Sequence, residues 1–446
     1  MSAVLRMLSV AELVESTRRR DGFNAPELDG AGNALLERAF GRPIDPETAV
    51  REIIRTVRAR GDIAVREWTS RLDGVDVAET RISEHVLSSA WADTKPSTRA
   101  ALSAAADRIR AFHEHQRETA NRGSNSAYLR PEPLHRVGCY VPGGRAAYPS
   151  TVLMSVIPAW VAGVESVVIA SPPAESATVH ELVAAAATLL GVGEVHAVGG
   201  AQAIAALAYG TGAIARVDKI VGPGNAFVTL AKRAVFGDVG IDQLAGPSEI
   251  LVIASDGADP AFIAADLVSQ LEHDPLAWAV CLTDDARLAG GVREHFASAA
   301  ASAQRGGIIA AAAGRNAAVV VCASLDEALD VAEAFAPEHL SLQGTAAEAL
   351  RDRVRAAGAI FCGAMSPVSI GDYVAGPNHT LPTQGAARYR GPLSVADFMR
   401  WPSVVQLSAS ELEGLAPIAC ELADAEGLPG HAVAIRARLA VLEGTR

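Results

Sequence analysis

Short, continuously apolar runs alternate with longer helical stretches from residue 138 onward, and this alternation restricts the fold more than any other feature of the chain. Runs that are apolar throughout indicate strands buried on both faces, and a helix between two such strands makes them parallel. In the first block the predicted strands are 138–141, 166–170, 195–198 and 219–221, and the predicted helices are 151–164, 179–190, 202–209 and 226–235. This pattern predicts a parallel sheet covered by helices on both faces.

A second block of the same kind begins near residue 250. Its predicted strands are 250–254, 278–283, 318–322, 339–342 and 359–362, and its predicted helices are 261–273, one that ends near 301, 325–336 and 346–357. Two successive blocks of similar size predict an α/β fold. We expect two Rossmann-like parallel-sheet domains, an incomplete duplication, with helical N- and C-terminal segments.

Outside these blocks the chain is expected to be helical. Asp45-Pro46 begins a predicted helix that ends near Gly61, and Ser97 is the expected N-cap of a helix that runs to about Arg117. The predicted organisation is an N-terminal helical segment (1–30), one α/β domain made of 31–139 plus 248–393, a second α/β domain (140–247) and a helical C-terminal segment (394–446).

Charge and cysteine content exclude several classes of protein. The net charge of −12 repels phosphate, so neither nucleic acid nor an anionic membrane is an expected partner. The most apolar stretch, 151–171, is interrupted by Pro158 and Glu165 and therefore predicts a buried helix and strand, not a membrane span. Five widely spaced cysteines without a CxxC pair, and an N-terminus unlike a secretory signal, predict a reducing, cytoplasmic location.

Four residues could supply ligands to a metal ion. Gln270 and His273 are three positions apart, so both lie on one face of the last turn of a predicted helix. Asp372 follows the strand 359–362, and open α/β sheets bind ligands at the carboxyl ends of their strands. His431 lies near the C-terminus. One amide, one carboxylate and two imidazoles suit zinc with a position left open, although each residue taken alone is more readily explained as a hydrogen-bonded structural residue.

Glu338 and His339 lie where a predicted helix gives way to a strand. Adjacent residues at such a junction can point in different directions, so a carboxylate and an imidazole there could perform two separate proton transfers. A surface glutamate beside a histidine at the edge of the core is the alternative.

Three glycine-rich turns each end a predicted strand and open a helix: Tyr140-Val141-Pro142-Gly143-Gly144, Gly199-Gly200-Ala201-Gln202 and Gly222-Pro223-Gly224-Asn225. Glycine lets the backbone approach a phosphate, and the helix N-terminus favours negative charge. The ordinary GxGxxG fingerprint is absent. Three turns in one block predict a nucleotide site, and tight structural turns are the alternative.

Nine motifs occur in the order that is typical of the histidinol dehydrogenase family, and the chain resembles that family over roughly residues 40 to 440. They are Val141-Pro142-Gly143-Gly144, Gly199-Gly200-Ala201-Gln202-Ala203-Ile204, Gly222-Pro223-Gly224-Asn225, Ala245-Gly246-Pro247-Ser248-Glu249, Ser269-Gln270-Leu271-Glu272-His273-Asp274, Ala336-Pro337-Glu338-His339-Leu340, Gly371-Asp372-Tyr373, Asn378-His379-Thr380-Leu381-Pro382-Thr383 and Ala425-Glu426-Gly427-Leu428.

The resemblance implies a zinc-containing oxidoreductase of histidine biosynthesis that oxidises L-histidinol to L-histidine through bound histidinaldehyde and reduces two NAD. It implies that 31–139 plus 248–393 form the catalytic and zinc domain and that 140–247 bind NAD. Zinc would anchor the imidazole and amino nitrogens of the substrate. By this resemblance the zinc ligands, which also contact the substrate, are Gln270, His273, Asp372 and His431.

The remaining roles also follow from the resemblance. His339 would be the general base, and Glu338 would activate water for the second oxidation. Both would contact substrate, as would Ser248, His379 and Glu426, whereas NAD would contact Tyr140, Gln202 and Asn225. The family is a domain-swapped homodimer, so Glu426 and His431 would act either in their own subunit or in the partner's site.

Three other functions compete with this interpretation. A paralogue could oxidise another polar alcohol, such as a sulfonated diol, on the same scaffold. A zinc hydrolase could use Glu338 with a metal-bound water and would need no NAD. A binding protein without catalytic activity is disfavoured because every candidate catalytic group is present.

Overall fold

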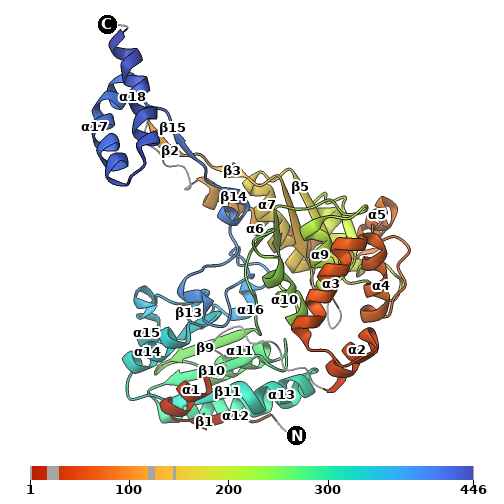
Figure 1. The fold of residues 1–446 in the computed structure, drawn as a ribbon. Coiled ribbons are helices and arrows are strands. Elements are labelled where there is room, and N and C mark those ends of the chain that lie inside the picture. Colours follow the sequence, from red (N-terminus) through yellow and green to blue (C-terminus); the bar gives the residue numbers. More distant parts are fainter. Residues whose placement is uncertain (1–2, 18–29, 119–125, 144–146, 445–446) are drawn as a thin grey trace. The chain divides into compact units, whose positions relative to one another are not determined.

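The structure is a computed structural model that describes residues 3–17, 30–118, 126–143 and 147–444 (Figure 1). Gly144, part of one predicted glycine turn, lies outside these residues, as does most of the second half of the predicted segment 1–30. No helix within the described ranges is long and apolar enough to cross a bilayer. The chain forms two compact units, residues 1–117 with 134–398 and residues 118–133 with 399–446.

The larger unit contains a five-stranded parallel sheet in the order β6-β5-β4-β7-β8. Its strands are β4 (Arg136–Tyr140), β5 (Ser166–Ser171), β6 (Val195–Ala197), β7 (Lys219–Val221) and β8 (Gly240–Ile241). The helices that follow its strands are α7 (Pro149–Ala162), α8 (Glu181–Leu189), α9 (Gly200–Tyr209) and α10 (Ala226–Val235). The predicted strands and helices of the first block are confirmed to within a few residues.

Helices from the first third of the chain pack around this sheet, mainly on its helices α8, α9 and α10. They are α2 (Gly30–Phe40), α3 (Pro46–Arg60), α4 (Asp62–Asp73), α5 (Glu84–Asp93) and α6 (Pro96–Glu118). The Asp45 side chain accepts a hydrogen bond from the Thr48 amide and so caps α3, as predicted. The apolar face of α3 packs with α9 in one buried cluster. Ser97 is not an N-cap, because α6 begins one residue earlier at Pro96, whose fixed φ suits the first helical position.

A six-stranded parallel sheet in the order β1-β11-β10-β9-β12-β13 forms the rest of the larger unit. Its strands are β1 (Arg6–Leu8), β9 (Glu249–Ala254), β10 (Trp278–Thr283), β11 (Ala317–Val321), β12 (His339–Gln343) and β13 (Ala359–Cys362). One face packs against α11 (Pro260–Leu271), α12 (Ala286–Ser302) and α13 (Gly306–Asn316). The other face packs against α1 (Val10–Thr17) and α14 (Leu325–Phe335).

The two sheets share one topology. Numbered by their order along the chain, the strands β6-β5-β4-β7-β8 and β11-β10-β9-β12-β13 both run 3-2-1-4-5, and β1 extends the second sheet at its edge. This is the doubly wound order of a Rossmann-like fold, in which the chain reverses direction between the first and fourth strands. The predicted fold class is therefore confirmed, while the predicted domain boundaries stay a prediction.

The smaller unit joins two antiparallel strand pairs to a helical hairpin. Strand β2 (Ala127–Leu129) pairs with β15 (Ser403–Val405), and β3 (Glu132–Pro133) pairs with β14 (Met399–Arg400). Helices α17 (Ala409–Ala425) and α18 (Pro429–Gly444) pack through Cys420, Ala423 and Ala432. Ser408 and Glu411 form a capping box at the start of α17.

Three secondary-structure predictions are wrong in part. Residues 1–30 were expected to be helical, but 6–8 form β1, which is held by the edge of β11. The segment from 394 begins with a 3-10 turn (Val395–Phe398), which is followed by β14 and β15, whose partner strands are far away in sequence. The predicted helix 346–357 is reduced to α15 (Thr345–Glu348) and a 3-10 turn (Arg351–Arg353), because the Arg355 amide donates to Glu333 of α14 at 2.7 Å and not to a helical carbonyl.

Candidate active site

The predicted catalytic residues lie at the amino ends of two neighbouring strands of the six-stranded sheet. His339 is the first residue of β12 and pairs in register with Ile250, the second residue of β9. Ser248 and Glu249 stand at the start of β9. Strands β9 and β12 are the first and fourth strands of the sheet, so these residues gather where the chain changes direction.

Two buried glutamates, Glu249 and Glu338, connect the amino ends of β9 and β12 by hydrogen bonds. The Glu249 amide donates to Glu338 Oε2 at 2.8 Å, and the Glu338 amide donates to Glu249 Oε2 at 3.3 Å. Glu249 Oε1 also accepts a hydrogen bond from the Gln384 amide at 3.1 Å. No role is predicted for Glu249 from the sequence. A charged residue at the start of a fully apolar strand nevertheless indicates a structural or functional role, because a buried carboxylate needs hydrogen-bond partners.

The imidazole of His339 is held in one tautomer. Its Nδ1 lies 2.9 Å from the carbonyl oxygen of Glu249, and a carbonyl can only accept, so Nδ1 carries the proton and Nε2 keeps its lone pair. Burial, together with positive charge on His273 and His379, lowers the pKa of His339 to about 4, while the hydrogen bond to the Glu249 carbonyl opposes this shift. At neutral pH the ring is therefore uncharged and able to accept a proton.

The predicted metal ligands of the larger unit come from two helix ends on one face of this sheet. Gln270 lies in the last turn of α11 and His273 two residues beyond its end. Asp372 follows α16 (Val368–Gly371), which contacts α11. The Asp372 carbonyl accepts a hydrogen bond from Nδ1 of His379 at 2.9 Å, and His379 Nε2 lies 3.4 Å from the Thr151 hydroxyl.

These donors fit a cation. Within the described ranges no hydrogen bond or ion pair engages the side chains of Gln270, His273 or Asp372. Burial raises the pKa of Asp372 to about 6, as expected for a carboxylate without a compensating charge. The described residues contain no group of three or more histidine, cysteine, aspartate or glutamate residues that could hold a metal. Of the four predicted zinc ligands, only His273 and Asp372 are residues of these types in the larger unit. The other two are Gln270, whose side chain is an amide, and His431, which belongs to the smaller unit.

Glu426 and His431 belong to the smaller unit. Glu426 ends α17, and His431 lies in the first turn of α18, with both residues exposed. The structure therefore brings together Ser248, Glu338, His339, Asp372 and His379, with Gln270 and His273 on the adjacent helix end, whereas Glu426 and His431 are placed only within their own unit.

The glycine turns lie at the carboxyl edge of the five-stranded sheet. Gly222 has φ of +109°, and a Cβ on it would lie 2.0 Å from the Tyr140 carbonyl oxygen, so only glycine permits this approach between β7 and β4. Tyr140 is buried, and its hydroxyl accepts from the Gly200 amide at 3.2 Å. Gln202 is also buried and donates to Asp73 at 3.1 Å. Asn225 is exposed and caps α10 through the Phe227 and Val228 amides.

Asp372 is predicted to lie at the carboxyl end of the strand 359–362. At the carboxyl edge of the six-stranded sheet, a Cβ on Gly344 would lie 2.6 Å from Ser255 Oγ, which accepts from the Ala347 amide. Asp372 lies instead beside Gly371, which packs on the Phe361 ring, and that ring is centred 6.0 Å from His339.

The connection between the two sheets explains why the candidate site lies at the amino edge of the six-stranded sheet. The chain leaves β8 at the carboxyl edge of one sheet and, seven residues later, enters β9 at the amino edge of the other. Seven residues span at most about 25 Å. The glycine turns and His339 must therefore lie at sheet edges that are close to each other.

Comparison with known proteins agrees with this arrangement. The profile of the histidinol dehydrogenase family matches residues 39–439, which include every predicted site residue. The chain belongs to the histidinol dehydrogenase family. Histidinol dehydrogenase of Parasynechococcus marenigrum is 49% identical over 399 residues, which cover 89% of this chain and 91% of that protein.

Other members of the histidinol dehydrogenase family match over still more of the chain. Histidinol dehydrogenase of Caulobacter vibrioides is 46% identical over 427 residues, covering 94% of this chain and 99% of that protein. The crystal structure of histidinol dehydrogenase from Elizabethkingia anophelis superposes with a TM-score of 0.89 at 31% identity, over 98% of this chain and 99% of that one.

Proposed function

We propose that this chain oxidises L-histidinol to L-histidine through bound histidinaldehyde, with the reduction of two NAD, as the last steps of L-histidine biosynthesis. Family membership supports the substrate, since the relatives are named for histidinol. The observation that carries the chemistry is the neutral His339, whose Nε2 lone pair is kept free by the Nδ1 bond to Glu249.

The proton steps follow from the two side chains at the start of β12. In the first oxidation His339 Nε2 takes the hydroxyl proton, and Glu338 then takes a proton from the water that adds to the aldehyde. NAD, when bound, would supply the hydride acceptor for the carbinol carbon and, after exchange for a second NAD, for the hydrated carbon. Glu338 Oε2 lies 3.5 Å from His339 Nδ1, so the two side chains are close enough to act on one bound substrate. Holding the aldehyde between the steps prevents its escape.

Zinc would be held by Gln270, His273 and Asp372 of one subunit together with His431. The donor set is supported by three side chains that lack hydrogen-bond partners among the described residues. When bound, this ion supplies an anchor for the imidazole and amino nitrogens of the substrate. Ser248, His379 and Glu426 would orient the rest of it, and NAD would occupy the glycine turns beside Tyr140, Gln202 and Asn225.

A homodimer with shared sites is part of the proposal. Leu415, Ile418 and Leu422 form one exposed face of α17, with 49, 62 and 59% of their surfaces exposed, and an apolar face of this kind favours a protein partner. We infer that Glu426 and His431 complete the partner's site. All five cysteines are described and are free thiols, which supports the cytoplasm as its location.

The test combines zinc analysis with the stoichiometry of NADH per L-histidinol. We expect bound zinc and two NADH for each histidinol. A turnover that is faster with a sulfonated diol would instead support the paralogue, and absence of NADH with zinc present would support a hydrolase.

Shared sites have their own test. Mixed dimers of His339→Ala and His431→Ala should recover activity that neither variant has alone, since each such dimer contains one intact site. No recovery in verified mixed dimers would show that His431 acts within its own subunit.

A further inference from the structure

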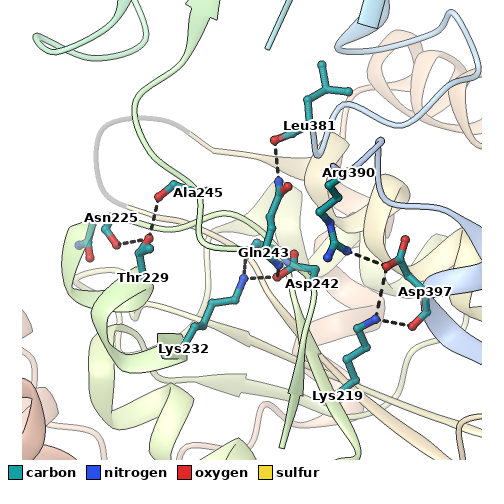
Figure 2. A network of polar contacts seen from close by, with 11 residues as sticks. Lys219, Asn225, Thr229, Lys232, Asp242, Gln243, Ala245, Leu381, Arg390 and Asp397 are labelled. Atoms are coloured by element: carbon teal, nitrogen blue, oxygen red, sulfur yellow. Dashed lines mark hydrogen bonds and ion pairs between the residues drawn. The ribbon is translucent and has the colours of Figure 1, made fainter. Parts of the chain in front are cut away.

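The loop that carries His379 is held by two neighbouring elements. Downstream of His379, Gln243 Nε2 donates to the Leu381 carbonyl at 2.6 Å, and Figure 2 shows this side chain pointing toward Leu381. Asp242, the residue before Gln243, forms a buried ion pair with Lys232 of α10 (Figure 2). The connection between the two sheets therefore fixes the downstream end of the loop.

Helix α7 approaches the same loop with one backbone carbonyl that the helix itself cannot satisfy. Pro158 lies inside α7 and has no amide hydrogen, so the carbonyl of Met154, four residues earlier, lacks its helical donor. The Asn378 side chain takes the place of that donor, since its Nδ2 donates to the Met154 carbonyl at 2.6 Å. The proline thus leaves an attachment point on the helix for a residue that is far away in sequence.

Both ends of the Asn378 amide are engaged. Its Oδ1 accepts a hydrogen bond from the Thr380 amide at 2.9 Å, so the side chain spans the backbone of His379. Asn378 is 3% exposed. A carbonyl can only accept and a backbone amide can only donate, so these two bonds fix which end of the side chain is Nδ2 and which is Oδ1. Asn378 therefore has one orientation, in which it holds the loop on both sides of His379.

The imidazole of His379 contacts α7 as well. Its Nδ1 lies 2.9 Å from the Asp372 carbonyl oxygen, which can only accept, so Nδ1 carries the proton and Nε2 keeps its lone pair. Thr151 lies one turn before Met154 on the same face of α7, and its hydroxyl is 3.4 Å from His379 Nε2. That distance is long for a hydrogen bond, so the lone pair can still accept from a donor group of the substrate. A shift of the loop along α7 would misdirect this lone pair.

We propose that Asn378 is a positioning residue that orients His379 toward the substrate, by attaching its loop to the carbonyl that Pro158 leaves open on α7. This inference rests on the proposed function, in which His379 orients the substrate. Asn378 needs no contact with substrate or NAD to act in this way. Its loss changes the position of His379, and a misplacement of about 1 Å can lower a rate by about 100-fold.

The test compares Asn378→Leu with the double variant Asn378→Leu/Pro158→Ala in the full-length, zinc-loaded enzyme. Leucine has a similar shape but cannot donate, so the Met154 carbonyl is left buried without a partner and the melting temperature should fall. Alanine at position 158 restores the helical amide, so the double variant should recover part of the melting temperature. The loop stays detached from α7 in both variants.

We expect kcat/KM for L-histidinol to fall by about 10- to 100-fold in both variants, because repair of the helix leaves His379 misplaced. The KM for NAD should stay near that of the wild type. The matched control is Gln343→Met. Gln343 is also a buried amide, and its Nε2 donates to Ser341 Oγ at 2.9 Å, but it lies at the carboxyl end of β12, away from His339. This control should lower the melting temperature and keep the wild-type kcat/KM.

Three outcomes would overturn the proposal. If the double variant recovers kcat/KM together with the melting temperature, the bond from Asn378 serves only the stability of α7. An unchanged kcat/KM in Asn378→Leu would show that His379 keeps its position without the bond. An equal loss of kcat/KM in Gln343→Met would indicate a general effect of stability on activity.

If the wild type transfers no hydride from L-histidinol, the proposed function fails, and hydrogen exchange then decides the inference separately. The double variant should raise exchange in 376–383 while 149–162 stays as protected as in the wild type. Unchanged exchange in 376–383 would refute the attachment of this loop by Asn378.

Discussion

Replacement of Asp242 by leucine should destabilise the larger unit severely. Lys232 and Asp242 are each 2% exposed, so the substitution leaves an ammonium group buried without its counter-charge. It also removes the acceptor for the Gly222 and Gln243 amides. Breaking a buried ion pair on one side costs about 3–5 kcal/mol. At about 2 °C per kcal/mol for a domain of this size, the melting temperature should fall by about 6–10 °C.

Differential scanning calorimetry at fixed protein concentration measures this change. The control is Glu67→Gln, which breaks an ion pair of similar geometry, since Arg60 contacts Glu67 at 2.6 and 2.8 Å. That pair is exposed, so water and salt screen it and the melting temperature should change little. The two substitutions therefore differ in the burial of the ion pair and in the two backbone amides that Asp242 also accepts.

The double variant Lys232→Met with Asp242→Leu identifies the cause of the loss. If the unpaired charge is responsible, removal of Lys232 as well should recover much of the melting temperature, because an apolar pair of similar volume can replace a buried ion pair. The reasoning is refuted if Asp242→Leu costs no more than Glu67→Gln. A double variant as unstable as the single one would assign the loss to the Gly222 and Gln243 amides.

Three other outcomes are expected. Glu338→Gln should slow oxidation of histidinaldehyde more than that of histidinol, measured with each substrate separately, and equal slowing would argue against water activation. His196 and Arg136 hold the pKa of Glu194 at about 2, below its ordinary value of 4.5, so its stabilisation is present above pH 4.5 and lost as pH falls through 2. Glu194→Gln should thus lower stability at pH 7 by about 1–2 kcal/mol after solvent screening and flatten the acid limb of melting temperature against pH; an unchanged acid limb would contradict this. Ile418→Asp should shift the protein toward monomer in size-exclusion chromatography and reduce activity, and a variant that stays fully dimeric would exclude α17 from the interface.

Most of the fold could be predicted because most strands of the two parallel sheets are apolar runs that can be recognised without knowledge of their partner strands. The strands 219–221, 278–283 and 359–362 have the bounds expected from their apolar runs. The missed strands have two or three residues, so no local periodicity marks them. All of them except β8, which pairs with β7, also depend on partners far along the chain. The shortened helix after residue 345 shows a tertiary contact, from Glu333, overriding a helical pattern.

The secondary-structure context of the candidate site residues could be predicted from the sequence, but the sheet edge at which they lie could not. The spacing of Gln270 and His273 correctly placed both at one helix end, and the Glu338–His339 junction was correctly placed at the start of a strand. The choice of sheet edge depends on how the two sheets are connected, which no single motif encodes. The pairing of Lys232 with Asp242 joins a helix to the end of a neighbouring strand, and sequence spacing gives no sign of it.

The pairing of strand β1 determines when its sheet can be completed during synthesis of the protein. Arg6 pairs with Ala318, so the first strand of the chain cannot be completed until about 300 further residues have been made. At about 5–20 residues per second, a ribosome needs roughly 15–60 s to supply them. The sheet that carries the glycine turns can form during that interval. The sheet that carries His339 cannot be completed until its later strands have been synthesised. Strand β1 is therefore accessible to chaperones until synthesis is well advanced.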